Sequence, residues 1–223
     1  MKRMDKIKNL LIMVFVLVFQ FSFSQTEAEA KKLLDEVSTK MGAYENMHIV
    51  FNTVLVNKEA GINEGDEPPI NGKITLQAEK YNLEYLGNTI IFNGKKLYVI
   101  NHDDKEVSIT EGDLDEEDGI IYPNKMLTFY KEGYNYKLGK MKNEKGRMLQ
   151  HVELFPIDSN SEIVQVTLCI DKVTKHIYKL IQQGSNGAIT TLTINHLKSN
   201  QEISPMIFTF NQKKYEQLDY LID

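Results

Sequence analysis

The chain has one cysteine and no tryptophan among its 223 residues. Cys169 by itself cannot close an internal disulfide, even in an oxidising compartment. The free energy of folding therefore has to come from a hydrophobic core. A chain of this length suits one domain with an ample core, and all-β barrels commonly reach this size as single units.

Familiar catalytic motifs are also missing. The sequence contains no glycine-rich phosphate loop followed by Lys and Ser or Thr, no G-x-S-x-G and no H-E-x-x-H. Cys169 lies on a predicted strand with no base in the pattern, so we expect an inert thiol. The five histidines are scattered without metal-ligand spacing: His48, His102, His151, His176 and His196. We predict no enzymatic activity, no metal and no cofactor.

The chain also lacks an apolar run long enough to cross a bilayer, which takes about twenty residues. Ten unbroken apolar residues at 10–19 follow a basic segment at 1–8, and the small residues Ser22 and Ser24 precede Gln25. This pattern predicts a secretory signal peptide over 1–24 and a mature domain over 25–223. No cysteine stands at the cut to carry a lipid anchor, so we expect a soluble, unattached protein in the periplasm.

Positive charge is scarce in the predicted mature protein. Residues 1–24 carry a net charge of +3, so their removal lowers the formal net charge from −5 to −8. An acidic surface disfavours nucleic acid and anionic membranes, because both are bound through Lys and Arg. We expect neither as a partner, and we expect a monomer. The stretch 103–118 holds nine carboxylates, but its glycine is displaced to Gly119, which favours a solvated acidic loop over a calcium site.

Apolar periodicity predicts one helix and many strands. Apolar residues recur at three- and four-residue steps from Thr26 to Met47, which is typical of an amphipathic helix. Most of the remaining sequence alternates between apolar and polar residues, and Asn93-Gly94 marks a hairpin turn. The predicted strands are 48–56, 72–78, 83–86, 89–92, 95–100, 105–110, 134–138, 148–154, 163–170, 176–182, 188–197 and 206–210.

About eleven consecutive strands with short turns indicate a mainly β protein with one wide antiparallel meander, which has to curl. The stretch 120–130 interrupts it with apolar residues around Pro123, and this composition predicts a short helical insertion. We expect exposed loops at 63–69 and 113–118. No internal repeat or long linker divides the chain.

Several strings resemble the periplasmic outer-membrane lipoprotein carrier (LolA) family. Gly72 begins an alternating strand that leads to EKYNL at 79–83, and FNGKKLY at 92–98 is similar to that family's D-G-K-x-L-W hairpin. VELFP at 152–156 is similar to its L-x-P strand end. The tail adds an N-G at 186–187, T-L-T at 191–193, Asn200 and F-T-F at 208–210. Taken in order, these strings cover nearly the whole mature chain.

The resemblance implies an unclosed β-barrel, capped by helices, that carries lipoprotein acyl chains between two membranes. The implied partners are acylated lipoproteins, an inner-membrane lipoprotein-releasing ABC transporter and a possible outer-membrane acceptor. We expect the lipid-binding cavity to be lined by Ile74, Leu76, Leu83, Tyr85, Ile91 and Tyr98. We expect the lid to comprise Ile120, Ile121, Met126, Leu127, Phe129 and Tyr130.

Lys80 stands where the family has an inward Arg that bonds to the lid. Counting by twos from Ile74 predicts an inward Lys80, and the resemblance implies that it acts as a lid latch. The alternative is a lysine at a strand end that extends to water. Two other functions also stay open: a sensor of lipid or lipoprotein on the same fold, and an envelope hydrolase with a lipid-like substrate.

Overall fold

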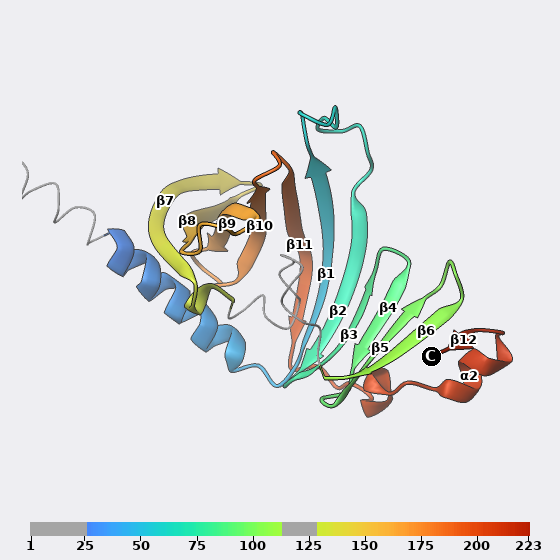
Figure 1. The fold of residues 1–223 in the computed structure, drawn as a ribbon. Coiled ribbons are helices and arrows are strands. Elements are labelled where there is room, and N and C mark those ends of the chain that lie inside the picture. The colour runs from blue at the N-terminus through green and yellow to red at the C-terminus, as the bar shows by residue number, and fades with distance from the viewer. Residues whose placement is uncertain (1–25, 113–128) are drawn as a thin grey trace, which may run out of the picture.

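A computed structural model describes residues 26–112 and 129–223 and contains one curled sheet (Figure 1). The described part of the sheet has twelve strands, in the order β12-β6-β5-β4-β3-β2-β1-β11-β10-β9-β8-β7. The strands of the first half are β1 (Met47–Val56), β2 (Ile70–Gln77), β3 (Lys80–Tyr85), β4 (Asn88–Phe92), β5 (Lys96–Asn101) and β6 (Glu106–Glu111). Those of the second half are β7 (Tyr134–Glu144), β8 (Arg147–Pro156), β9 (Ile163–Asp171), β10 (Ile177–Gly184), β11 (Ile189–Ser199) and β12 (Leu221–Ile222).

Two antiparallel meanders, β1–β6 and β7–β11, are joined where β1 pairs with β11. The strand β12 adds to β6 in parallel at one edge, and β7 forms the other edge. The sheet is therefore not closed. The prediction of an unclosed antiparallel half-barrel with about eleven strands is confirmed, and β12 is an additional short strand.

Alternation along the strands gives the sheet two distinct faces. In β1, every second residue from Met47 to Thr53 is buried, and the residues between them are partly exposed. We call the face that carries the main hydrophobic cluster the inner face. A smaller cluster lies on the outer face over β4–β6 and comprises Ile91, Ile100, Val107 and Tyr215, with Tyr98, Ile109, Phe210, Tyr220 and Ile222 packed against it.

An N-terminal helix occupies residues 26–42 and lies along the β7–β10 end of the sheet (Figure 1). Its buried residues follow helical spacing and join the main cluster: Ala30, Leu34, Val37 and Met41. The helix is shorter than the predicted span of 26–47, because it ends at residue 42 and Met47 already begins β1. Within the described residues, no helix is long and apolar enough to span a bilayer.

The predicted strand at 206–210 is wrong. Pro205 follows Ser204, whose hydroxyl accepts a hydrogen bond from Met206 N, and the 3-10 helix η3 (Pro205–Phe208) forms instead. Proline favours the first turn of a helix and cannot donate to a strand ladder. The chain then continues through α2 (Gln212–Gln217) to β12.

The turn predictions fare better. Asn93 and Gly94 do join β4 to β5, and Gly94 has the positive φ (90°) that the turn requires. The predicted loop at 63–69 is exposed as expected. The predicted loop at 113–118 and the lid residues Ile120, Ile121, Met126 and Leu127 lie outside the described residues.

Candidate functional site: the apolar inner face

The inner face of β1–β5 is apolar over five adjacent strands. Strand register shows how its side chains adjoin, because directly paired residues of neighbouring strands point to the same side. Ile49 pairs with Ile74, Ile74 with Leu83, and Leu83 with Ile90. The apolar residues of this surface that belong to the main cluster or pack against it are Met47, Ile49, Phe51, Ile74, Leu76, Tyr81, Leu83, Tyr85, Ile90, Phe92, Leu97 and Val99.

The N-terminal helix lies over the other half of the sheet. The Tyr44 hydroxyl and His176 Nε2 share a hydrogen bond of 2.7 Å, and Lys175 Nζ lies 2.7 Å from Glu36 Oε2. Glu36 belongs to the helix and Tyr44 follows its end, so these contacts hold the helix and its C-terminal end to the turn between β9 and β10. The Lys175 ammonium group holds the pKa of Glu36 below its ordinary value. The helix is thus fixed beside β7–β10, and among the described residues no α-helix lies over the inner face of β1–β5 (Figure 1).

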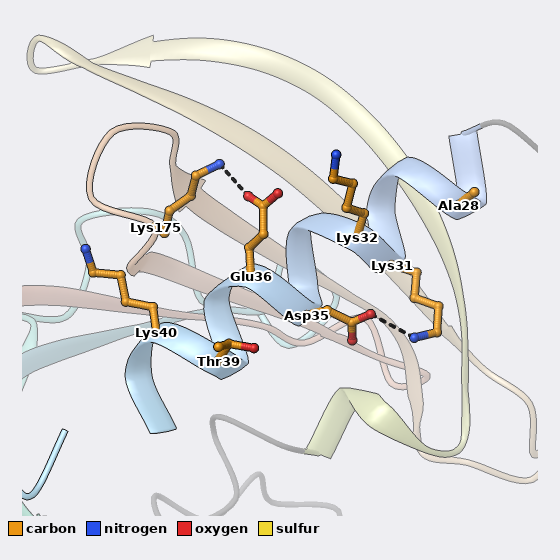
Figure 2. Close-up of a pocket in the computed structure, with 8 residues that line it drawn as sticks. All are labelled: Ala28, Lys31, Lys32, Asp35, Glu36, Thr39, Lys40 and Lys175. Carbon is orange, nitrogen blue, oxygen red and sulfur yellow. Dashed lines mark hydrogen bonds and ion pairs between the residues drawn. The ribbon is translucent and has the colours of Figure 1, made fainter. Parts of the chain in front are cut away.

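A groove of about 670 Å³ runs along the solvent side of this helix, and Figure 2 shows its lining side chains. Two ion pairs, Lys31 with Asp35 and Lys175 with Glu36, border it. The remaining residues of the lining include Lys32 and Lys40. Six of its eight lining residues are charged, and Ala28 is the one apolar residue among them, so the groove is a poor candidate for a lipid chain.

Phe51 dominates the centre of the apolar inner face. Its ring lies directly over Gly72, where a Cβ would overlap the ring atoms, and it packs against Tyr85 with ring centroids 5.5 Å apart. The Tyr85 hydroxyl in turn shares a hydrogen bond of 2.7 Å with Thr53 Oγ1. Sequence reasoning did not single out Phe51, Gly72 or Thr53 as site residues. The alternation of strand 48–56 was the available signal.

Four of the six predicted cavity residues share the inner face. Ile74, Leu76 and Leu83 belong to the main cluster, and Tyr85 packs against it. The other two do not join them. Ile91 and Tyr98 lie in the second cluster on the outer face, and Tyr98 stacks on Phe210 with centroids 4.8 Å apart.

The register of β3, β4 and β5 explains why Ile91 and Tyr98 lie on the outer face. Leu83 pairs with Ile90, and Ile90 pairs with Val99. Because successive residues of a strand point to opposite faces, Ile91 and Tyr98 point outward. The inner face therefore carries Ile90 and Val99, and the predicted cavity residues Ile91 and Tyr98 lie on the outer face.

The predicted inward position of Lys80 is wrong. Ala78 and Glu79 form a two-residue turn, in which Ala78 has a positive φ (51°), so Gln77 pairs with Lys80 and Leu76 with Tyr81. The turn shifts the count by one, and Tyr81 takes the inward position. The Lys80 side chain is exposed at the end of the hairpin, which is the alternative of a lysine that extends to water.

Of the predicted lid residues, Phe129 and Tyr130 lie within the described chain, in η2 (Phe129–Lys131). Tyr130 is 1% exposed, and its hydroxyl donates to the Leu34 carbonyl of the N-terminal helix at 3.3 Å. Burial raises the pKa of Tyr130 to about 12. In the structure, Tyr130 is a core residue between the helix and β7.

The histidines and the cysteine are dispersed over the sheet. His48 contacts Thr75, and His102 contacts Thr89. His151 is buried, and among the described residues its Nε2 has no hydrogen-bond partner. Burial raises the pKa of the Cys169 thiol to about 11, which makes it a poor nucleophile at neutral pH. Across residues 26–112 and 129–223, no group of three or more His, Cys, Asp or Glu side chains could hold a metal ion.

The open sheet, with a helix along one end and an apolar inner face, has the unclosed β architecture that we expected from the sequence. No protein-family model matches the sequence, and no curated relative matches it. Solved structures do match. The chain aligns with an uncharacterized conserved protein from Thermus thermophilus at a TM-score of 0.58 and 10% identity, over 87% of this chain and 98% of that one.

Two further structures are similar. A DUF1329 family protein from Desulfovibrio piger aligns at a TM-score of 0.50 and 9% identity, over 82% of this chain and 97% of that one. A LolA superfamily protein from Nitrosomonas europaea aligns at a TM-score of 0.44 and 12% identity, over 81% of this chain and 97% of that one. At these identities the likeness is one of fold. The open, mainly β fold that the sequence led us to expect is confirmed.

Proposed function

We propose that this protein is a periplasmic carrier that binds the acyl chains of lipoproteins on the inner face of β1–β5 and shuttles them from the inner to the outer membrane. The observation that carries the proposal is the apolar surface that five strands form around Phe51. The N-terminal helix lies beside this surface, along β7–β10 (Figure 1). Burial of an acyl chain is worth about 0.8 kcal/mol per methylene. An apolar surface of this kind is what such a cargo needs in water.

The predicted signal peptide also supports a role as a carrier. The predicted signal peptide at 1–24 would place the mature chain in the periplasm without an anchor, so it could leave one membrane and reach another. The chain has no recognisable ATP-binding motif. Loading would then be driven by an inner-membrane lipoprotein-releasing ABC transporter, and unloading by an acceptor with higher affinity for the acyl chains.

The predicted lid belongs to the same proposal. Ile120, Ile121, Met126 and Leu127 would cover the bound chains, and a lid that fills the cavity when empty would keep affinity moderate. A Met side chain suits a surface that repacks around different ligands. The proposal does not use Lys80 as a latch, because its side chain points away from the inner face.

Binding of an apolar fluorescent probe tests the site. Ile90 and Ile109 form a matched pair, because both are partly buried isoleucines on nearby strands, but Ile90 packs against the main cluster and Ile109 against the outer one. Ile90→Asn should weaken saturable probe uptake several-fold, and Ile109→Asn should leave it unchanged. Equal effects of the two substitutions, or no saturable uptake by the parent protein, would refute binding on the inner face.

Mass spectrometry of material that co-purifies from the periplasm tests the cargo. Triacylated lipoproteins would support the carrier. Free phospholipid, or a bound signalling protein, would instead indicate the sensor that the sequence left open.

A further inference from the structure

A pair of hydroxyl groups interrupts the apolar inner face. Thr53 occupies one position in a row of directly paired residues that crosses the sheet from β2 to β7. The row consists of Ile70, Thr53, Leu192, Leu180, Leu168, Val152 and Leu138. Thr53 is the one polar residue of the seven, and it is 7% exposed. Its partner is the Tyr85 hydroxyl, at 2.7 Å.

This pair has hydrogen-bonding capacity to spare. Each hydroxyl carries one donor hydrogen, and the bond between Thr53 and Tyr85 uses one of the two. Among the described residues, neither hydroxyl makes a second hydrogen bond. Thr53 is buried, Tyr85 is half-buried, and the other residues of the row are aliphatic, so the row itself offers no acceptor side chain. The remaining donor is therefore suited to an acceptor that a ligand brings with it.

The pair also lies where the apolar surface changes from exposed to buried. On one side of it, Leu55 is 45% exposed and Ile70 is 41% exposed. On the other side, Leu83 is 6% exposed and Ile74 is 1% exposed. An amphiphile bound along these strands would place its chain towards Leu83 and its head towards Leu55.

We infer that the hydroxyl pair of Thr53 and Tyr85 binds the carbonyl oxygen of an acyl ester and so fixes the depth and direction of the bound chain. The ligand class is an acyl ester of glycerol, in which the carbonyl lies at the junction of chain and head. This inference rests on the proposed function, and it adds recognition of the ester to the apolar binding already proposed.

Competition against an apolar fluorescent probe tests it. The competitors are a 1-monoacylglycerol and its 1-O-alkyl ether analogue of equal chain length, both below their micelle concentrations. Only the ester has the carbonyl acceptor, so the parent protein should bind the ester about two- to tenfold more tightly than the ether. Tyr85→Phe should remove this preference and leave ether binding nearly unchanged.

Three further variants separate recognition from packing. Thr53→Val should also remove the preference, and Thr53→Ser, which keeps the hydroxyl, should retain it. Tyr98→Phe removes a tyrosine hydroxyl from the outer face and should have no effect. These tests remain informative if Tyr85→Phe fails to fold.

The outcomes distinguish this inference from the proposed function. Equal binding of ester and ether by the parent protein, or a preference that survives both Tyr85→Phe and Thr53→Val, would overturn the ester site and leave the carrier standing. Failure of both competitors to displace the probe would overturn acyl-chain binding as well.

Discussion

Gly72 is the position where the inner face depends most directly on the absence of a side chain. A Cβ added there would overlap Phe51 Cζ and would lie 2.7 Å from Cε2 and 2.9 Å from Cε1. Carbon atoms in favourable contact are about 3.5 to 4.0 Å apart. The Phe51 ring is 5% exposed and packs against Tyr85, so Gly72→Ala should force it out of its present position.

We expect two measurable consequences. Overpacking of a core typically costs about 1 to 3 kcal/mol. For a chain of this size each kcal/mol lowers the melting temperature by about 2 to 4 °C. The displaced Phe51 ring should also enter the space proposed for the ligand, so the affinity for an apolar probe should fall together with stability.

A double-mutant cycle measures the contact itself. Phe51→Leu shortens the side chain, so Gly72→Ala should cost less in that background, with a coupling free energy of about 1 kcal/mol or more. Gly42→Ala is the matched control, because a Cβ at Gly42 has no atom within 4 Å. That change at the end of the N-terminal helix should be neutral or stabilise by up to about 1 kcal/mol.

Thermal or urea unfolding of each variant gives the stability changes and the coupling free energy. Titration of each variant with the probe gives its affinity. The reasoning about Gly72 fails if Gly72→Ala unfolds and binds probe like the parent protein. It also fails if the substitution costs the same in the presence of Phe51 and of its leucine replacement.

Three further predictions concern titratable groups. Burial lowers the pKa of His176 and His151 below the ordinary value of 6.5, so the unfolded chain binds more protons below about pH 6.5. The free energy of unfolding should therefore fall as the pH drops through this range, and His176→Gln should reduce that dependence in melts at about pH 7.5 and about pH 5. Cys169 should resist alkylation at about pH 8 in the native protein and react readily in denaturant. Tyr130→Phe should cost about 0.5 to 1.5 kcal/mol in urea unfolding through loss of the bond to Leu34, and a parental stability would contradict that bond.

Local patterns predicted most of the fold. The alternation of apolar and polar residues located β1 to β11, because a strand with one buried face requires a period of two. The helical spacing of Ala30, Leu34, Val37 and Met41 located the N-terminal helix. Its end was less predictable, because apolar residues at Tyr44 and Met47 continue the spacing after the helix has ended.

The assignment of side chains to faces was harder, because it depends on turn lengths. A count by twos carried from Ile74 through the turn at Ala78 and Glu79 put Lys80 on the inner face, whereas the structure pairs Lys80 with Gln77 and points it outward. A one-residue difference also decides between Ile90 and Ile91, because successive residues of a strand point to opposite faces. Both are isoleucines in one short apolar run, and only the pairing of Leu83 with Ile90 tells which one faces inward.

The C-terminal segment covers the apolar outer face of β4–β6. Ile91, Ile100 and Val107 give β4–β6 an apolar outer surface, which would be exposed without a cover. The cover is a stack of aromatic rings. The ring centroid of Phe210 lies 4.8 Å from that of Tyr98 and 5.3 Å from that of Tyr215. Pairing of β12 with β6 fixes this cover at the edge of the sheet. Since residues of the C-terminal segment cover the outer apolar surface, substitutions in the ring stack should affect stability far more than probe binding.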